Sequence, residues 1–376
     1  MRPALERHFR SMVDMIPVLR PCLPPEEQLA PYLKAIDRSR VYSNFGPHVC
    51  AFEERLAAHY GLEHETVTTV ANATLGLALV LMAQDVSPGS LCVMPGWTFA
   101  ATANAAVLAG MIPFFVDVDP STWALDPRAI EQEITRAPAK VGAVMVVAPF
   151  GRPIDYPAWD DFKSQSGLPV VIDAAAAFDS LHVGETPAVV SLHATKVLGI
   201  GEGGFVACRD VSIVRSIRHR SNFGFAGSRV AATLGMNAKL SEYHAAIGLA
   251  ALDAWPETRA RWMAAARVYR HELKRSNQIG LQPGFGETWI SSTCIVSVDE
   301  HASARMQDRL AAAEIETRLW WGRGAHNQPA AAHFPRTQLP VTERLGRETF
   351  GIPLYPDIEP HKIRSVTGIL IAAASM

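Results

Sequence analysis

Seven short runs of apolar and β-branched residues follow one another between residues 65 and 210, and this alternation constrains the fold more than any other feature of the sequence. The runs cover residues 65–71, 90–95, 112–118, 141–150, 168–175, 188–193 and 204–210. Helix-like segments such as TLGLALVLMAQ and ATANAAVLAG separate several of them. This pattern predicts an α/β fold with a mostly parallel central sheet covered on both faces. In such sheets, ligands bind at the carboxyl ends of the strands.

The sequence on either side of this region has a different character. PPEE at residues 24–27 predicts a helix start, and VCAFEERLAAHYG predicts a second helix. After about residue 255 a charged helix precedes short strands and further helices, with ASARMQDRLAAAEI expected as a helix and ETRLWW as a strand. We therefore expect two domains: residues 1–255, an N-terminal arm with a large α/β domain, and residues 256–376, a small C-terminal α+β domain.

Composition excludes several classes of function. The chain has 35 Lys and Arg against 37 Asp and Glu, a net charge of -2, so no basic field favours nucleic acid or a membrane surface. Its 5 cysteines include no Cys-x-x-Cys pair, which argues against structural zinc or a disulfide framework. The charged amino terminus lacks the apolar core of a secretory signal, and no apolar run is long enough to span a bilayer. We expect a cytoplasmic protein without a metal site.

Lys196 ends the polar segment SLHATK, between an apolar run and a glycine-rich turn. An amine held out of bulk water there is a candidate nucleophile, because burial disfavours the ammonium form. A surface lysine in a loop is the alternative. Asp173, which ends the apolar run LPVVI, is either one half of a buried ion pair or a carboxylate that keeps a pyridine nitrogen protonated. The 23 residues between Asp173 and Lys196 allow the two side chains to lie on neighbouring strand ends.

Two further segments follow strand ends. Asn72, Ala73 and Thr74 stand where a run ends and a helix begins, so they form either a phosphate site or a plain N-cap. Trp97 is either a core aromatic or a platform on which a ring stacks. The glycines of residues 199–204 match the dinucleotide pattern Gly-x-Gly-x-x-Gly, but they lead into a strand-like run and not into a helix. We interpret them as a hairpin-like turn.

Jointly, these residues resemble the DegT/DnrJ/EryC1/StrS aminotransferases over nearly the whole chain. The matching motifs are SLHATK (191–196) with GEGG (201–204), DAA (173–175), PGWTFAATAN (95–104), FVDVDP (115–120), GMNAKLSE (235–242) and PLYP (353–356). The resemblance implies a pyridoxal-phosphate enzyme of fold type I, the aspartate-aminotransferase fold. It further implies an amino donor, by family analogy glutamate, and a keto sugar attached to a nucleotide as acceptor.

The resemblance also implies roles for individual residues. Lys196 would bind the cofactor covalently, Asp173 would pair with its ring nitrogen, and Trp97 would stack on its ring. Ala73, Thr74 and Ser191 would hold its phosphate. Asn237 would reach the phosphate of the partner subunit's cofactor, which makes a homodimer part of the site.

The chain departs from the family's pattern at two places. Ala176 stands where the family commonly has glutamine or histidine against the cofactor's phenolic oxygen, and Ser221-Asn222-Phe223-Gly224 stands where Arg-Asn-His-Gly is common. The first change removes a hydrogen bond but no proton-transfer group, so it bears on the substrate more than on the reaction. Lys196 argues against the family's dehydratase branch, which has histidine in its place.

Three further residues are candidates for substrate contacts. Tyr42 and Asn44 lie in a turn-rich loop, and His326 precedes Asn327, Gln328 and Pro329. A plain turn, and a surface histidine, are the alternatives. Two rival functions also stay open: a pyridoxal-phosphate reaction on another keto substrate such as a cyclitol, and a noncatalytic sensor that binds the cofactor or a sugar nucleotide.

Overall fold

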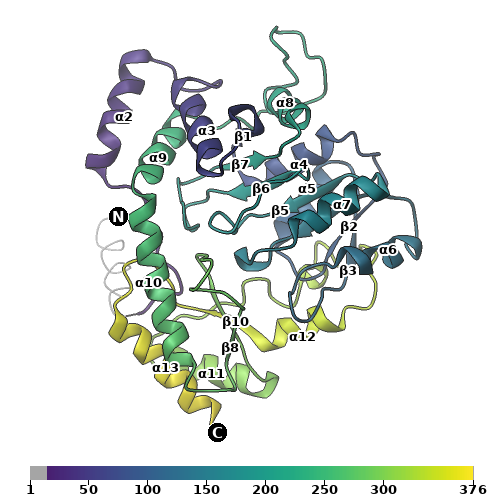
Figure 1. Cartoon of the computed structure of the whole chain (residues 1–376). Coiled ribbons are helices and arrows are strands. Elements are labelled where there is room, and N and C mark those ends of the chain that lie inside the picture. The colour runs from purple at the N-terminus through teal and green to yellow at the C-terminus, as the bar shows by residue number, and fades with distance from the viewer. Residues whose placement is uncertain (1–14, 376) are drawn as a thin grey trace, which may run out of the picture.

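One sheet has its strands in the order β1-β7-β6-β5-β4-β2-β3 in the computed structural model, which describes residues 15–375 (Figure 1). Strands β2 to β6 pair in parallel, whereas β7 is antiparallel to both of its neighbours, β1 and β6. Each strand falls within one of the predicted runs: β1 Val67–Val70, β2 Leu91–Pro95, β3 Ile112–Val116, β4 Val141–Val147, β5 Val170–Asp173, β6 Ala188–Ser191 and β7 Gly204–Ala207. The predicted mostly parallel sheet is confirmed.

Both faces of this sheet are buried. Along β4, Val144 and Val146 belong to one apolar cluster, while Ala143 and Met145 belong to another. Two buried faces explain why the strands are apolar throughout and do not alternate with polar residues. The helices between and after the strands are α4 Ala73–Ala83, α5 Ala100–Leu108, α6 Pro127–Thr135, α7 Tyr156–Ser166 and α8 Val211–Arg220.

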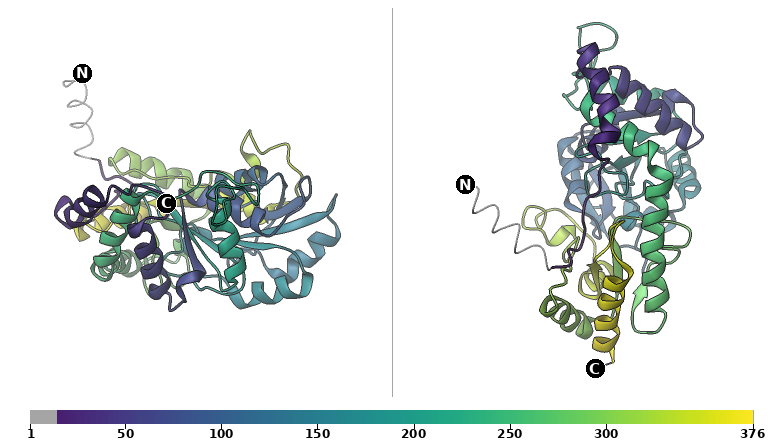
Figure 2. Two further views of the ribbon diagram at one scale, coloured as in Figure 1. Left: turned by 90° about the horizontal axis from the view of Figure 1, so that it is seen from above. Right: turned by 90° about the vertical axis from the view of Figure 1, so that its left-hand side faces the viewer.

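A second, three-stranded antiparallel sheet has the order β10-β9-β8. Its strands are β8 Gly280–Leu281, β9 Cys294–Ser297 and β10 Thr349–Ile352. The long helix α10 (Trp255–Leu273) packs against α13 (Pro360–Ala374) beside this sheet (Figures 1 and 2). The remaining α-helices of the described residues are α2 Glu26–Ser39, α3 Pro47–His59, α9 Glu242–Asp253, α11 Glu300–Ala312 and α12 Pro340–Glu348.

The expected strand at ETRLWW, residues 316–321, is wrong. Arg318 makes only an isolated bridge to Gly351. Trp321 instead stacks on Phe150, which follows β4 of the large sheet, with ring centroids 3.9 Å apart. Gly322 and Gly324 then turn the chain at φ +56 and +96, a conformation that suits glycine. Aromatic packing and this turn therefore outweigh the strand propensity of the segment.

Backbone hydrogen bonds join distant parts of the chain. Ile16 N donates to Glu314 O at 2.9 Å, which fixes the start of the described chain to the C-terminal part. Phe115 N, in the large sheet's edge strand β3, donates to Pro335 O at 3.1 Å, which joins the C-terminal part of the chain to this strand. The domain boundary near Trp255 stays a prediction. The expected lack of a secretory signal rests on the segment 1–14, which lies outside the described residues. Between residues 15 and 375, no helix has the length and apolar character needed to cross a membrane.

Candidate active site

Lys196 lies in the connection between β6 and β7. These two strands pair antiparallel, with Ser191 opposite Gly204, so residues 192–203 form a hairpin loop. Lys196 N donates to His193 O at 2.8 Å, which closes the turn before the lysine. Gly201 has φ +96, which only glycine adopts easily. The hairpin interpretation of the glycine-rich segment is confirmed, and the dinucleotide pattern is a coincidence.

The Lys196 side chain is partly buried and has no hydrogen-bond or ion-pair partner among the described residues. Within residues 15–375, no carboxylate lies within 4.0 Å of its Nζ and no hydrogen bond involves it. Burial lowers the pKa of Lys196, and the negative charge of Asp173 opposes that shift. The lowered pKa leaves more of the amine unprotonated near neutral pH, as a nucleophile or general base requires.

Asp173 ends β5 and its side chain is 5% exposed. Its Oδ2 accepts from Thr102 Oγ1 at 2.8 Å, and its Oδ1 accepts from Ala175 N at 3.2 Å. Burial raises the pKa of Asp173, opposed by these hydrogen bonds and by Lys196. A buried carboxylate without a hydrogen-bonded cation suits a pyridinium N–H as its missing partner. The buried ion-pair interpretation therefore fits less well than the cofactor one.

The start of α4 forms a small cradle. Asn72 caps the helix, and its Oδ1 accepts from Leu75 N at 3.0 Å. The backbone N–H groups of Ala73 and Thr74 are then the first-turn donors left for a ligand. Gly204 lets β7 approach the start of α4 closely, because a Cβ there would lie 3.1 Å from Ala73 N. Its strand neighbour Ser191 borders the same place, so the N-cap and phosphate-site interpretations are compatible.

Trp97 is 2% exposed and lies in an aromatic cluster. Its ring centroid is 5.3 Å from that of Trp321 and 6.1 Å from that of Phe150, both in edge-on geometry. Phe99, by contrast, is 58% exposed and precedes α5. The Phe99 carbonyl accepts from Thr102 N at 3.2 Å, so Phe99 lies one turn from the residue that holds Asp173. The stacking role of Trp97 remains a prediction, and Phe99 is a second candidate.

Asn237 is exposed on the connection between α8 and α9, which extends from the body above α8 in Figure 1.

Tyr42 is 48% exposed and stacks on Tyr243 with ring centroids 6.1 Å apart. Asn44 is exposed and has a left-handed backbone, φ 65, as does its neighbour Phe45, φ 58. Two consecutive non-glycine residues of this kind are costly and mark a loop whose shape is fixed by its surroundings.

His326 is not a surface histidine, since it is only 3% exposed. Its Nε2 lies 2.9 Å from Asn327 Nδ2, while its Nδ1 has no hydrogen-bond partner among the described residues. Burial lowers the pKa of His326, aided by Arg336 and opposed by Glu343 and Asp117. Because Nδ1 is itself buried beside Gly96 and Gly324, the expected contact of His326 with substrate stays a prediction.

Ala176 lies at the departure from the family pattern, and its backbone decides the shape of the neighbouring loop. A Cβ at Gly151 would lie 2.3 Å from Ala176 O, so only glycine allows this approach.

The sequence did not assign a role in the site to three residues: Thr102, Thr98 and Phe99. They lie in the recognised motif PGWTFAATAN, but the spacing of their side chains relative to Asp173 depends on where α5 starts.

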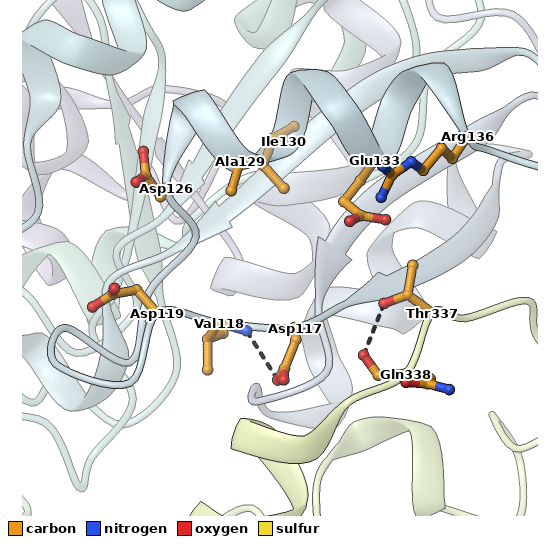
Figure 3. A pocket seen from close by; sticks show the side chains of 10 residues that line it. All are labelled: Asp117, Val118, Asp119, Asp126, Ala129, Ile130, Glu133, Arg136, Thr337 and Gln338. Atoms are coloured by element: carbon orange, nitrogen blue, oxygen red, sulfur yellow. Dashed lines mark hydrogen bonds between the residues drawn. The ribbon is translucent and has the colours of Figure 1, made fainter.

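A cavity of about 480 Å³ lies away from these residues, between α6 and the chain before α12 (Figure 3). Its lining includes Asp117 and Asp119, and none of the predicted site residues. Asp117 accepts from Val341 N and Thr342 N, each at 2.8 Å, and thereby caps α12. Asp119 accepts from Ser121 N at 2.9 Å and stabilises a turn. Both carboxylates therefore have structural partners.

Comparisons with known proteins test the family and the fold. The profile of the DegT/DnrJ/EryC1/StrS aminotransferase family matches residues 25–371. The UDP-2-acetamido-2-deoxy-3-oxo-D-glucuronate aminotransferase of Pseudomonas aeruginosa is 31% identical over 86% of this chain and 90% of its own. The dTDP-4-amino-4,6-dideoxy-D-glucose transaminase of Shigella dysenteriae is 35% identical over 68% of this chain and 70% of its own.

Among solved structures, DesI with its TDP-sugar product superposes with a TM-score of 0.85. It is 31% identical and covers 96% of this chain and 93% of its own. The predicted enzyme class and fold class are confirmed by these comparisons. The chain therefore belongs to the DegT/DnrJ/EryC1/StrS aminotransferase family.

Proposed function

We propose that the protein is a pyridoxal-phosphate-dependent aminotransferase that moves an amino group from an amino acid, by family analogy glutamate, to a keto sugar attached to a nucleotide. The observation that carries this proposal is the placement of Asp173 and Lys196: Asp173 ends β5, and Lys196 lies in the loop that follows β6, the strand paired in parallel with β5. Each side chain shifts the pKa of the other, and burial favours the neutral lysine. The two residues supply an amine and a fixed carboxylate for one cofactor.

The cofactor is pyridoxal 5'-phosphate, which when bound supplies the electron sink that acidifies the α-carbon of an amino acid. The described residues fit this group. Asp173 would accept the ring N–H, while the N–H groups of Ala73 and Thr74 at the start of α4 and the hydroxyl group of Ser191, which pairs with Gly204, would hold the phosphate. Phe99 supplies an exposed aromatic face one turn from Thr102, which favours it over the buried Trp97 for the ring contact.

The protein's own groups then divide the chemistry. Lys196 Nζ, when it is free, takes the proton from the α-carbon of the amino donor and later returns a proton to the acceptor carbon. Asp173 keeps its negative charge in place before the reaction begins, so the stabilisation needs no rearrangement. The hydroxyl group of Thr102 holds that carboxylate in position, and the hydroxyl group of Thr98 in turn contacts that of Thr102.

A nucleotide-linked keto sugar is the acceptor class that the relatives support, since the Pseudomonas enzyme is named for a UDP-linked 3-oxo sugar and the Shigella enzyme for a dTDP-linked amino sugar. Tyr42, Asn44 and His326 are the proposed contacts for the sugar. The fixed loop around Asn44 and the exposed side chain of Tyr42 offer donors and acceptors suited to hydroxyl groups. Nδ1 of His326 is buried beside Gly96 and Gly324, so the two loop residues carry this part of the proposal.

We also infer a cytoplasmic homodimer with shared active sites. The extended connection between α8 and α9 presents Phe223, Val230 and Leu234, which are 48%, 73% and 84% exposed. Exposed apolar side chains on a projecting segment are typical of an interface. In this dimer, Asn237 reaches the phosphate of the partner's cofactor.

The test is spectroscopic and chemical. Purified protein with bound cofactor is expected to lose the absorbance band of the lysine-bound cofactor when glutamate is added. Nucleotide-linked 3-keto and 4-keto sugars and a keto cyclitol are then offered, and mass spectrometry detects the amine. A coloured protein that never bleaches with any amino acid would indicate a sensor, and amination of the cyclitol alone would replace the acceptor class.

A further inference from the structure

The carboxamide of Asn237 is held in one orientation by a neighbouring lysine. Lys239 Nζ donates to Asn237 Oδ1 at 2.7 Å. An ammonium group has donors and no acceptor, so the amide must turn its oxygen toward it. The amide nitrogen of Asn237 then points its two N–H groups elsewhere, and within residues 15–375 nothing accepts from them. An anion is the partner that such donors suit.

An aromatic ring holds the lysine in turn. Lys239 Nζ lies 4.9 Å from the centroid of the Phe223 ring, within the range of a cation–π contact. Phe223 takes the place where the family commonly has histidine, and its backbone is left-handed, φ 59. A histidine there could compete as a charged group or a donor, whereas the phenyl ring offers the ammonium only its face. Burial lowers the pKa of Lys239, in agreement with an ammonium packed against apolar surface.

The three side chains come from two segments joined through their backbones. Asn222 and Asn237 form an isolated antiparallel bridge, and Phe223 N donates to Met236 O at 3.1 Å. Ala71 N donates to Ala238 O at 2.7 Å, which anchors the second segment to the end of β1, next to Asn72. The lysine, the ring and the carboxamide therefore sit on a fixed frame and not on a free loop.

We propose that Lys239 is a positioning residue for Asn237: it fixes the carboxamide so that the amide N–H groups face the phosphate of the partner subunit's cofactor, and Phe223 holds the lysine in that place. This inference rests on the proposed function, in which Asn237 crosses the dimer. It predicts a role in binding the phosphate group specifically, and not in folding or in proton transfer.

The experiment compares two ligands on cofactor-stripped full-length protein. The affinities for pyridoxal phosphate and for pyridoxal, which lacks the phosphate, are measured for wild type, Lys239→Met, Lys239→Arg, Phe223→Leu and Asn237→Ala. Lys239→Met is expected to weaken binding of pyridoxal phosphate roughly tenfold, the effect of a lost hydrogen bond to a charged group, while pyridoxal binding stays within about twofold. Lys239→Arg is expected to restore most of the affinity, and Phe223→Leu to show a smaller loss.

The double variant Asn237→Ala/Lys239→Met tests whether the lysine acts through the asparagine. It is expected to bind no more weakly than Asn237→Ala alone. An additional loss would show that Lys239 acts by its own charge, and equal losses for both ligands would show a merely structural role; either result overturns the inference. If Asn237→Ala itself kept full affinity for pyridoxal phosphate, the cross-subunit contact would fall as well, whereas an unaffected Lys239→Met beside a weakened Asn237→Ala would remove this inference alone.

Discussion

Thr102 Oγ1 donates a hydrogen bond of 2.8 Å to Oδ2 of Asp173, and both side chains are buried. Because a hydroxyl group has one proton, Thr102 can only accept from Thr98, whose Oγ1 lies 2.6 Å away. The two threonines therefore form a directed chain that ends on the carboxylate. This chain offsets part of the cost of burying a negative charge.

Removal of the Thr102 hydroxyl tests this chain. Thr102→Val keeps the shape of the side chain but leaves Oδ2 without a donor, so we expect kcat to fall roughly tenfold, the effect of a hydrogen bond to a charged group. The pH at which the bound cofactor's absorbance changes should shift as well. Thr98→Val is the matched control and should have a smaller effect, since Thr98 does not contact Asp173. Unchanged kcat and spectra for Thr102→Val would contradict the assignment.

Substitution of the lysine separates chemistry from folding. Lys196→Ala removes the amine but leaves Asp173 and the start of α4 in place, so the melting temperature of the protein should change little. Turnover should fall by roughly 10²–10⁴-fold or more, as expected when a general base is lost. Single-turnover assays with glutamate measure this loss. Wild-type rates for the variant would overturn the central assignment.

Asp173 also affects the stability of the cofactor-free protein. Its folded-state pKa is raised by burial, so its contribution to stability is present at low pH and is lost as the pH rises through the folded-state pKa. Asp173→Asn removes this loss, because the amide stays neutral. The cofactor-free variant should therefore melt at a higher temperature than wild type at pH 7, and the difference should shrink as the pH falls toward about 3.9, the ordinary pKa of aspartate. A difference that grows on acidification would refute this expectation.

Two aromatic residues compete for the cofactor's ring. Phe99→Ala should weaken cofactor binding with little loss of stability, because Phe99 is 58% exposed. Trp97→Ala should cost about 3–5 kcal/mol of unfolding free energy, as for other buried tryptophans. Trp97→Phe keeps more of the packing and serves if the alanine variant fails to fold. Urea unfolding and cofactor titration of all three variants show which residue contacts the ring. If a stable Trp97→Phe bound the cofactor weakly and Phe99→Ala bound it normally, the stacking role would return to Trp97.

The sequence was most informative where local pattern and tertiary packing agree. The strands of the large sheet are buried on both faces, so their residues are apolar without interruption and the runs are visible directly. ETRLWW misled because its aromatic residues have strand propensity but pack on Phe150 instead. Thr102 and Phe99 could not be assigned, because their roles depend on how α5 begins relative to Asp173. The antiparallel direction of β7 was implied only by the short glycine-rich link before it.

The position of β1 at the edge of the large sheet has a consequence for synthesis of the chain. Among residues 15–375, its only partner in that sheet is β7, so residues 67–70 must wait for residues 204–207 to leave the ribosome before they can pair. The cradle formed by Ala73 and Gly204 is incomplete until then, and the apolar helix α4 lacks part of its cover. Nascent chains that end before residue 204 are therefore expected to need chaperone protection and to bind no cofactor phosphate.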